Sequence, residues 1–324
     1  MSEASLDRFI ERMPKAELHL HLEGSIRPAT LLRLASRHRV DLPATTVDGI
    51  RQWYRFGDFA EFVDVYLACL KSLRDPEDFQ LVTDEVMADL ERQNVVYCEA
   101  HLTVGIHAAN GVNLDELADA MAEVIEAGRR RRGVTLRLIT DIVRNLPEQA
   151  DLTLEWALAE RWRSVAALGL SGFESEPDEP FREHFAEAER QGLHRTAHAG
   201  ENTDAANIRS ALEHCRPERI GHGIRAVEDP PLMEELRSVG VPLEVCPSSN
   251  VALGSVPSLE EHPFDLLVGA GVEVTVNTDD PAYFDVTLSE EYRRIRRTWG
   301  YPAERLAGFS LAAVRHAFLE PGDR

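Results

Sequence analysis

Lysine is almost missing from this chain of 324 residues. Lys15 and Lys71 are the only two, and arginine carries the rest of the basic charge. Acidic residues outnumber basic ones by 56 to 35, which gives a formal net charge of −21 at pH 7. An acidic surface gains no counterion release on nucleic acid and is repelled by anionic lipid. We therefore expect no nucleic acid and no membrane as a partner, and a small neutral or cationic molecule as the substrate.

Cysteine is scarce as well, and its four residues are scattered without a C-x-x-C motif: Cys69, Cys98, Cys215 and Cys246. This spacing predicts neither a disulfide framework nor a cysteine-rich zinc site. Residues 1–13 are too polar for a signal peptide, and no apolar run approaches the roughly 18 residues that a membrane-spanning helix needs. These absences favour a cytoplasmic protein.

What the chain does contain is a regular alternation of short apolar runs and amphipathic stretches. The runs predict eight strands at residues 16–22, 95–102, 136–143, 165–170, 195–198, 219–224, 242–246 and 272–276. The stretches predict helices at residues 115–130, 151–161, 179–191, 204–215, 229–239 and 258–268. Eight strand–helix repeats predict a parallel α/β fold closed into a (β/α)8 TIM barrel, with residues 1–324 as one domain.

The first two predicted strands lie unusually far apart in the sequence. Residues 29–93 separate them and contain helical patterns such as residues 59–73 and 77–92. Because the segments that follow barrel strands lie at the catalytic mouth, we expect this helical insertion to form a lid.

Side chains able to bind a metal or transfer a proton follow four of the predicted strands. They are His19 and His21, His198 and Glu201, His222, and Asp279 and Asp280. One His-x-His pair on a strand face is a weak signal, because two surface histidines have the same spacing. In a TIM barrel, however, catalytic groups come from the C-terminal ends of strands. Their repetition at four strand ends therefore predicts an active site.

Three imidazoles and one carboxylate suit zinc, so we expect one Zn²⁺ per chain held by His19, His21, His198 and Asp279. A catalytic zinc lowers the pKa of bound water to about 7, which supplies a hydrolytic nucleophile near neutral pH. The predicted strand at residues 165–170 has no lysine that could bridge two metals as a carbamate, so a single ion is favoured. The same ligands could also hold iron or cobalt.

Three residues outside this ligand set are candidates for the chemistry. Glu201 is expected to donate a proton to the substrate, and the alternative is a helix N-terminal cap. His222 could take a proton from the water and stabilise the attacking oxygen, and the alternative is a core histidine. Asp280 could accept a hydrogen bond from the substrate or orient the water. His101 is a further candidate, and the remaining histidines are interpreted as surface or helix residues: His38, His107, His184, His194, His214, His262 and His316.

Five motifs stand in order along the chain: residues 18–28 (LHLHLEGSIRP), 198–201 (HAGE), 219–223 (RIGHG), 244–250 (EVCPSSN) and 276–284 (VNTDDPAYF). Together they resemble the successive motifs of the adenosine deaminase family of the amidohydrolase superfamily. The resemblance runs from about residue 14 to about residue 284.

The resemblance implies roles for these residues in the hydrolysis of a 6-aminopurine. It implies a zinc ion on His19, His21, His198 and Asp279, with Glu201 protonating ring N1 while the water oxygen adds at C6. It implies His222 as general base and electrostatic stabiliser, Asp280 as the contact to N7, and the Gly172 amide as the contact to N3. The implied partner is a purine base or nucleoside.

The identity of the substrate depends on two segments. Glu23 stands where animal adenosine deaminases carry the aspartate that contacts ribose, whereas adenine deaminases of the family also have glutamate there. Residues 56–75 are similar to bacterial members, including those that act on aminodeoxyfutalosine. We expect adenosine, deaminated to inosine and ammonia, or a close derivative, with adenine and aminodeoxyfutalosine as alternatives. A pocket closed by bulky groups would admit only the free base, whereas an open one would admit ribose.

A binding protein that keeps the fold without turnover is a remote alternative. Loss of a metal ligand or of the proton donor would mark such a protein. All the expected positions are present here, which favours an enzyme.

Overall fold

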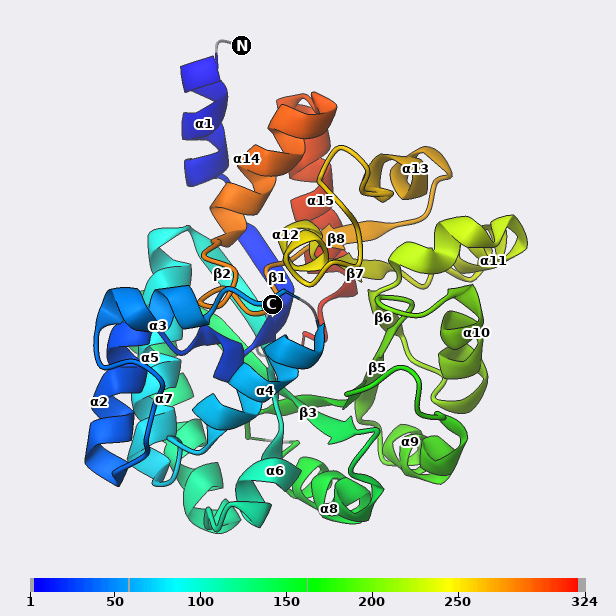
Figure 1. Cartoon of the computed structure of the whole chain (residues 1–324). Coiled ribbons are helices and arrows are strands. Elements are labelled where there is room, and N and C mark those ends of the chain that lie inside the picture. Colours follow the sequence, from blue (N-terminus) through cyan, green and yellow to red (C-terminus); the bar gives the residue numbers. More distant parts are fainter. Residues whose placement is uncertain (1–2, 58, 162, 320–324) are drawn as a thin grey trace.

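The computed structural model describes residues 3–57, 59–161 and 163–319. Its eight strands form one parallel sheet in sequential order. They are β1 (Lys15–His21), β2 (Val95–Leu102), β3 (Thr135–Val143), β4 (Val165–Ser171), β5 (His194–Ala199), β6 (Arg219–His222), β7 (Leu243–Val245) and β8 (Val274–Val276). Every predicted strand is present, with its ends within two residues of the predicted ones. The predicted TIM barrel is therefore confirmed (Figure 1).

The barrel closes between its first and last strands. Leu20 of β1 bridges Asp279, which lies just beyond β8. The His21 amide donates to the Asp279 carbonyl at 2.7 Å, and the Asp279 amide donates to the His19 carbonyl at 3.1 Å. The closure thus brings Asp279 beside the histidines of β1.

Helices surround the strands because parallel strands must be covered on both faces. They are α1 (Glu3–Arg12), α6 (Val104–Ala109), α7 (Leu114–Arg132), α8 (Ala150–Glu160), α9 (Arg182–Arg190), α10 (Ala205–His214), α11 (Pro230–Val239), α12 (Pro247–Ala252), α13 (Phe264–Gly269), α14 (Leu288–Trp299) and α15 (Ala303–His316). Short 3-10 turns are η1 (Glu23–Ser25), η2 (Pro147–Gln149), η3 (Glu179–Phe181) and η4 (Ile224–Glu228). Strands β1 and β4 are buried at every position.

Local signals explain where several helices begin and end. The Asn113 side chain accepts from the amides of Asp115 and Glu116 at the start of α7, and Gly133 ends that helix in the left-handed conformation. The helix predicted over residues 258–268 begins only at Phe264. Pro263 disfavours helical geometry in the residue before it, so the turn of chain ahead of α13 is not helical.

The insertion between β1 and β2 consists of four helices: α2 (Pro28–His38), α3 (Val47–Trp53), α4 (Phe59–Leu70) and α5 (Pro76–Arg92). Helix α4 crosses the mouth of the barrel, while α2, α3 and α5 lie together at its side (Figure 1). Ring contacts join α4 to the segment after β8, since Phe62 stacks on Phe284 with centroids 6.0 Å apart. The insertion is therefore placed to cover the barrel mouth.

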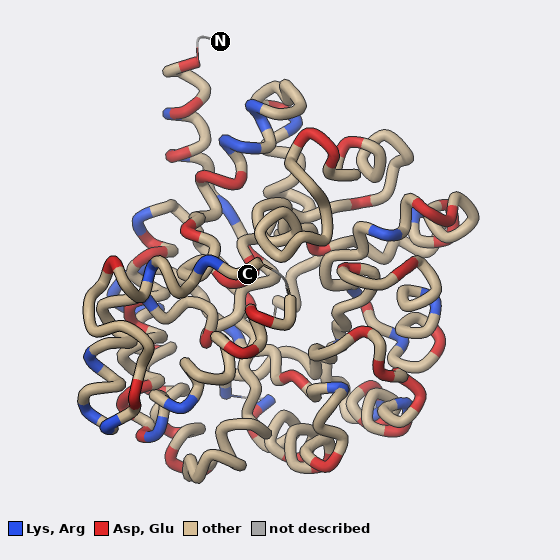
Figure 2. Tube along the Cα trace, viewed as in Figure 1, with Lys and Arg blue, Asp and Glu red and all other residues tan. Residues whose placement is uncertain are grey.

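Acidic residues are distributed over the surrounding helices rather than gathered on one of them (Figure 2). Within the described residues, no helix combines the length and the apolar composition that crossing a bilayer requires.

Candidate active site

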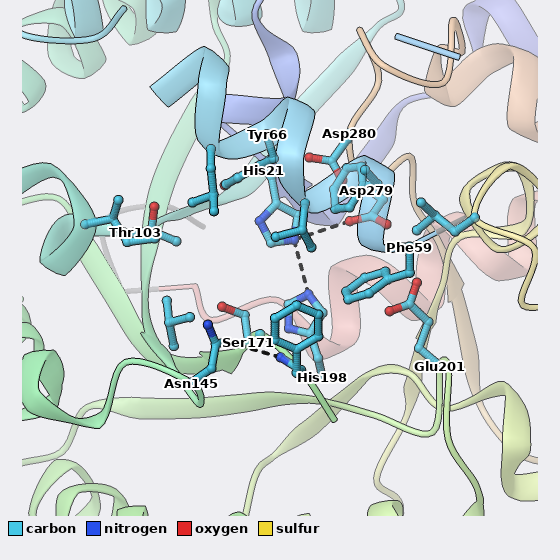
Figure 3. A pocket seen from close by; sticks show the side chains of 18 of the residues that line it. His21, Phe59, Tyr66, Thr103, Asn145, Ser171, His198, Glu201, Asp279 and Asp280 are labelled. Atoms are coloured by element: carbon cyan, nitrogen blue, oxygen red, sulfur yellow. Dashed lines mark hydrogen bonds and ion pairs between the residues drawn. The ribbon is translucent and has the colours of Figure 1, made fainter. Parts of the chain in front are cut away.

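Four candidate metal ligands converge at the C-terminal end of the barrel. They are His19 and His21 of β1, His198 of β5 and Asp279 after β8. The Nε2 atoms of His21 and His198 lie 3.1 Å apart. The Oδ1 atom of Asp279 lies 3.5 Å from His19 Nε2 and 3.3 Å from His21 Nε2. Figure 3 shows His21, His198 and Asp279 pointing toward one another.

This arrangement fits a zinc ion. Ligand atoms at about 2.0–2.1 Å from a tetrahedral zinc lie about 3.3 Å from one another, close to the distances found here. The Nε2 atom of His19 is buried and makes no hydrogen bond within the described part of the chain. A buried imidazole nitrogen without a hydrogen-bond partner is costly, and a metal ion would satisfy it.

Hydrogen bonds within the chain orient these candidate ligands. Each of three ligands uses its second polar atom within the protein: His19 Nδ1 on Glu244 Oε2 (2.9 Å), His198 Nδ1 on the Leu170 carbonyl (3.0 Å) and Asp279 Oδ2 on the Ser249 hydroxyl (2.6 Å). Such outer partners fix the orientation of a metal ligand. Gly221 gives His19 its space, because a Cβ there would lie 2.9 Å from His19 Cε1.

Two site residues have a backbone conformation that is rare outside glycine. His222 has φ 60° and Asp279 has φ 66°. Left-handed backbone at a non-glycine residue costs free energy and persists only where the surroundings enforce it. His222 is the last residue of β6 and Asp279 lies three residues beyond β8, and both side chains line the cavity described below. The His222 Nε2 atom lies 3.9 Å from Glu201 Oε2 and from Asp279 Oδ2.

Glu201 is buried and has one carboxylate oxygen without a hydrogen-bond partner among the described residues. Burial raises its pKa well above the usual value, and the charges of Asp279 and Glu174 raise it further. These shifts favour the protonated carboxylic acid, the form that can donate a proton. The alternative role of Glu201 as a helix N-terminal cap is wrong, because Asp204 caps α10 by accepting from the amides of Ala206 and Asn207.

The loop that carries Glu201 is fastened by Glu174, which follows β4. The Glu174 carboxylate accepts from the amides of Glu201, Asn202 and Thr203 at 2.9, 2.9 and 3.0 Å. Glu174 could not be predicted as part of the site, because no local pattern connects it to a segment 27 residues later.

Asp280 is buried beside the metal-ligand group, and its Oδ1 atom has no hydrogen-bond partner among the described residues. Burial raises its pKa well above the usual value, and the charge of Asp279 adds to the effect. Gly24 allows this placement, because a Cβ at that position would lie 1.7 Å from Asp280 Oδ1.

Glu23 is fully buried and does not line the cavity described below. Its Oε1 atom accepts from the Thr103 amide at 2.8 Å and the Thr103 hydroxyl at 2.7 Å, and lies 3.1 Å from His107 Nε2. Burial alone would raise its pKa, but His107 and Thr103 outweigh burial and lower it to about 2. An ionised Glu23 thus lies behind the pocket wall, and its Oε2 atom has no hydrogen-bond partner among the described residues.

Three further histidines are buried in the structure: His101, His107 and His262. His101 pairs its Nδ1 atom with Asp141 at 2.9 Å and stacks on His21 with centroids 4.7 Å apart, but it does not line the cavity. His107 lies on a helix, as interpreted, yet it is buried. His262 is buried in a loop, so its interpretation as a surface or helix residue is wrong. The amphipathic stretch at residues 258–268 predicted a helix there and did not reveal this burial.

A cavity of about 300 Å³ opens above the metal-ligand group. Helix α4 contributes a bulky wall to it: Phe59, Phe62, Val63, Tyr66 and Leu67. His21, His198, Glu201, His222, Asp279 and Asp280 line its inner end. Gly172 lines it too, with φ 89°, and a Cβ there would lie 2.7 Å from Asn145 Oδ1. Among the described residues that line this cavity, none is lysine or arginine. Figure 3 shows Phe59 and Glu201 on one side of it, and Thr103 and Asn145 on the other.

Comparison with known proteins places this geometry in a family. The family model described as adenosine deaminase matches residues 14–324. An aminodeoxyfutalosine deaminase of Streptomyces coelicolor is 38% identical over 98% of this chain and 83% of its own length. The structure of an adenine deaminase of Arthrobacter aurescens matches with a TM-score of 0.91 and 32% identity, over 96% of this chain and 95% of the other. An amidohydrolase of Burkholderia ambifaria with bound zinc matches with a TM-score of 0.91 and 26% identity, over 99% and 90%.

Proposed function

This chain belongs to the adenosine deaminase family, and we propose that it hydrolyses 6-aminopurines with free adenine as its preferred substrate. The family and the relatives make the protein a deaminase, a hydrolase that acts on C–N bonds. The proposal concerns the substrate, the single zinc ion and the roles of the site residues. One observation carries the choice of adenine: the cavity wall from α4 is bulky and apolar.

The α4 wall affects the choice of substrate because of where N9, the purine atom that carries ribose in a nucleoside, would lie. With C6 at the metal-ligand group, N9 lies at the far end of the purine and faces α4. That wall offers one polar side-chain group, the Tyr66 hydroxyl, for the several hydroxyls of a ribose. A hydroxyl buried without a partner costs about 1–3 kcal/mol. We therefore place adenine ahead of adenosine, which was the first expectation from the sequence.

The charged side chains that line the cavity affect whether larger, anionic substrates can bind. Aminodeoxyfutalosine carries a benzoate, and nucleotides carry phosphate. The described lining residues include no lysine or arginine that could pair with either anion. A buried anion without a partner is strongly disfavoured, which supports the neutral base over both.

The proposed chemistry assigns each polar group one contact. His19, His21, His198 and Asp279 would hold one zinc ion per chain. When bound, the ion would supply water acidified from a pKa of about 15.7 to about 7. Glu201 gives its proton to N1 while the water oxygen adds at C6. Asp280 holds N7, and the Gly172 amide holds N3.

The protons balance without another reagent. After the oxygen has added, the bond from C6 to the amino nitrogen breaks. One proton of the water leaves on that nitrogen as ammonia, and the other restores the carboxylic acid of Glu201. Adenine and water thus become hypoxanthine and ammonia, with N1 keeping the proton from Glu201.

The test is ammonia release from purified, metal-analysed protein with adenine, adenosine, deoxyadenosine and aminodeoxyfutalosine. We expect kcat/KM for adenine to exceed that for each nucleoside by at least about tenfold, the discrimination that filling a pocket can supply. Equal or higher kcat/KM for adenosine would overturn the substrate choice. Absence of turnover on all four with zinc bound would overturn 6-aminopurine deamination altogether.

A variant of α4 tests the wall directly. Phe62→Ala removes a ring from the cavity wall and should raise the ratio of adenosine to adenine kcat/KM by about tenfold. Leu311→Ala is the matched control, because Leu311 lies exposed on α15 and does not line the cavity. An unchanged ratio in Phe62→Ala would contradict the proposed position of N9.

A further inference from the structure

A chain of hydrogen bonds runs from the start of α13 to His222. The donor and the acceptor in each bond can be assigned by starting at α13. The backbone amide of Phe264 donates to His262 Nδ1 at 3.0 Å. A backbone N–H can only donate, so His262 Nδ1 carries a lone pair. A neutral imidazole has one protonated nitrogen, which places the hydrogen of His262 on Nε2.

The next bond fixes the Asn250 side chain. His262 Nε2 lies 3.1 Å from Asn250 Oδ1 and donates to it. The amide nitrogen of Asn250 then faces His222 Nδ1 at 3.2 Å. All three side chains are buried, so water does not compete for these atoms. Because an amide nitrogen can only donate, His222 Nδ1 must accept.

The opposite orientation of Asn250 is chemically forbidden. With its oxygen and nitrogen exchanged, the amide nitrogen would donate to His262 Nε2. His262 would then accept at Nε2 and at Nδ1 together, which only an imidazolate anion can do. The Phe264 amide therefore determines the orientation of Asn250, which X-ray density alone seldom distinguishes.

The consequence concerns the nitrogen of His222 that faces the substrate. With a lone pair on Nδ1, neutral His222 carries its hydrogen on Nε2, the atom 3.9 Å from Glu201 Oε2. A nitrogen that already bears a hydrogen cannot take another proton. An added hydrogen on Nδ1 would set an N–H against the Asn250 amide nitrogen, so the hydrogen-bond geometry favours the form with the hydrogen on Nε2 alone.

We propose that Asn250 and His262 are positioning residues that hold His222 in its Nε2–H form. His222 then donates a hydrogen bond to the oxygen that adds at C6, and it is not a general base. This inference rests on the proposed function and replaces the general-base part of the role that the family resemblance implied. Donors directed at developing negative charge contribute about 10²–10³ in kcat.

The first experiment reads the tautomer without any substrate. Long-range ¹H–¹⁵N correlation spectra of zinc-loaded protein labelled in its imidazoles distinguish the two neutral forms, and loss of one signal set in His222→Gln assigns His222. We expect protonated Nε2 and bare Nδ1. Protonated Nδ1 in His222 would overturn the inference, whatever the enzyme's substrate proves to be.

The second experiment reverses the tautomer with one atom. Asn250→Asp replaces the donating nitrogen with an accepting oxygen, which favours a hydrogen on His222 Nδ1 and a lone pair on Nε2. We expect kcat to fall about 10²–10³-fold, with bound zinc retained and KM for adenine within about threefold. If His222 were the general base, this variant would keep or raise kcat, and that result would overturn the inference.

A pair of variants at His262 gives a decision even if Asn250→Asp fails to fold. His262→Leu removes the donor and frees the Asn250 amide to turn, so kcat should fall about tenfold with zinc retained, as when an outer partner is lost. His262→Gln supplies an amide donor in place of the imidazole and should restore the kcat that the leucine variant loses. Equal loss in both variants would show a packing role only and would overturn the inference. Absence of deamination in the unmodified enzyme, with the His222 tautomer as expected, would count against the proposed function alone.

Discussion

Around the two ends of strand β6 lie charged and polar side chains that are all buried but very differently paired. At its start, each side-chain nitrogen of Arg219 has a partner: Glu244, Glu99 and the His316 carbonyl. The ring of Phe318 also lies 3.5 Å from the guanidinium carbon. At the mouth of the barrel beyond His222, buried atoms of Glu201, Asp280 and His19 have no hydrogen-bond partner among the described residues.

This difference in pairing distinguishes buried groups that stabilise the fold from buried groups that are available to a ligand. A buried charge whose hydrogen bonds are all made helps to hold the barrel together. An unpaired buried acceptor or donor, in contrast, is costly unless a ligand satisfies it. This matches the general division of TIM barrels, with catalysis at the C-terminal ends of the strands. Glu244 joins the two regions, because one of its oxygens pairs with Arg219 and the other with His19. Burial would raise its pKa, but Arg219 and His19 lower it to about 2, which keeps it ionised.

The largest expected effect comes from removing a ligand at the mouth. His19→Ala should lose zinc and activity together, with a fall in zinc affinity beyond the roughly 10–100-fold that loss of an outer partner causes. Metal analysis after dialysis and an ammonia assay measure both quantities. Full zinc occupancy in the variant would exclude His19 from the metal-ligand group.

Glu201→Gln tests the unpaired proton donor with the metal site intact. We expect zinc to be retained and kcat to fall at least about 10²–10⁴-fold, the contribution of general acid catalysis. The free energy of unfolding should not decrease, because glutamine places a neutral amide of the same shape where a buried carboxyl group with an unpartnered oxygen stood. Activity near that of the unmodified enzyme would contradict the role of Glu201.

Arg219→Met tests the paired end of β6. It leaves Glu99 and Glu244 buried without their cation, and removal of one partner from a buried pair costs about 3–5 kcal/mol. Urea unfolding of the zinc-free protein measures the loss without the stabilisation that metal adds. The matched control is Arg315→Met, which breaks an exposed pair with Glu273 and should cost at most about 1 kcal/mol. Equal losses in the two variants would remove the distinction between the two ends.

The smallest expected effect concerns pH and Glu174. The Glu174 charge raises the pKa of Glu201, so Glu174→Gln should lower that pKa. A general acid must be protonated, so kcat declines as pH rises through its pKa. The alkaline decline of kcat in the variant should therefore begin at lower pH. A decline that stays in place or moves to higher pH would contradict the coupling.

Much of the site could be predicted because its motifs are local. Residues 198–201 and 276–284 contain a candidate metal ligand and a candidate acid within a few positions, and strand ends in a TIM barrel all face one mouth. The insertion was also foreseeable, since 29–93 is too long for a simple connection. The motif at residues 244–250 already contained Ser249 and Asn250, but nothing in it shows which side chain each contacts.

Other features depend on contacts between distant segments. Three examples are the cavity wall from α4, the hydrogen bonds of Glu174 to the Glu201 loop and the burial of His107 against Glu23. Each joins residues that no local pattern connects. The α4 wall, which led us to propose adenine ahead of adenosine, could not be foreseen for that reason. The sequence shows aromatic residues in 56–75 but not the direction they face.

By itself, the sequence determined the barrel, the order of its strands and the positions of the candidate metal ligands and the candidate acid, because apolar periodicity and motif spacing are properties of the chain. Only the tertiary structure decided which ring nitrogen of His222 carries a hydrogen and what closes the pocket. Those properties depend on hydrogen bonds and packing between segments brought together by folding, such as Phe264, His262 and Asn250 behind His222.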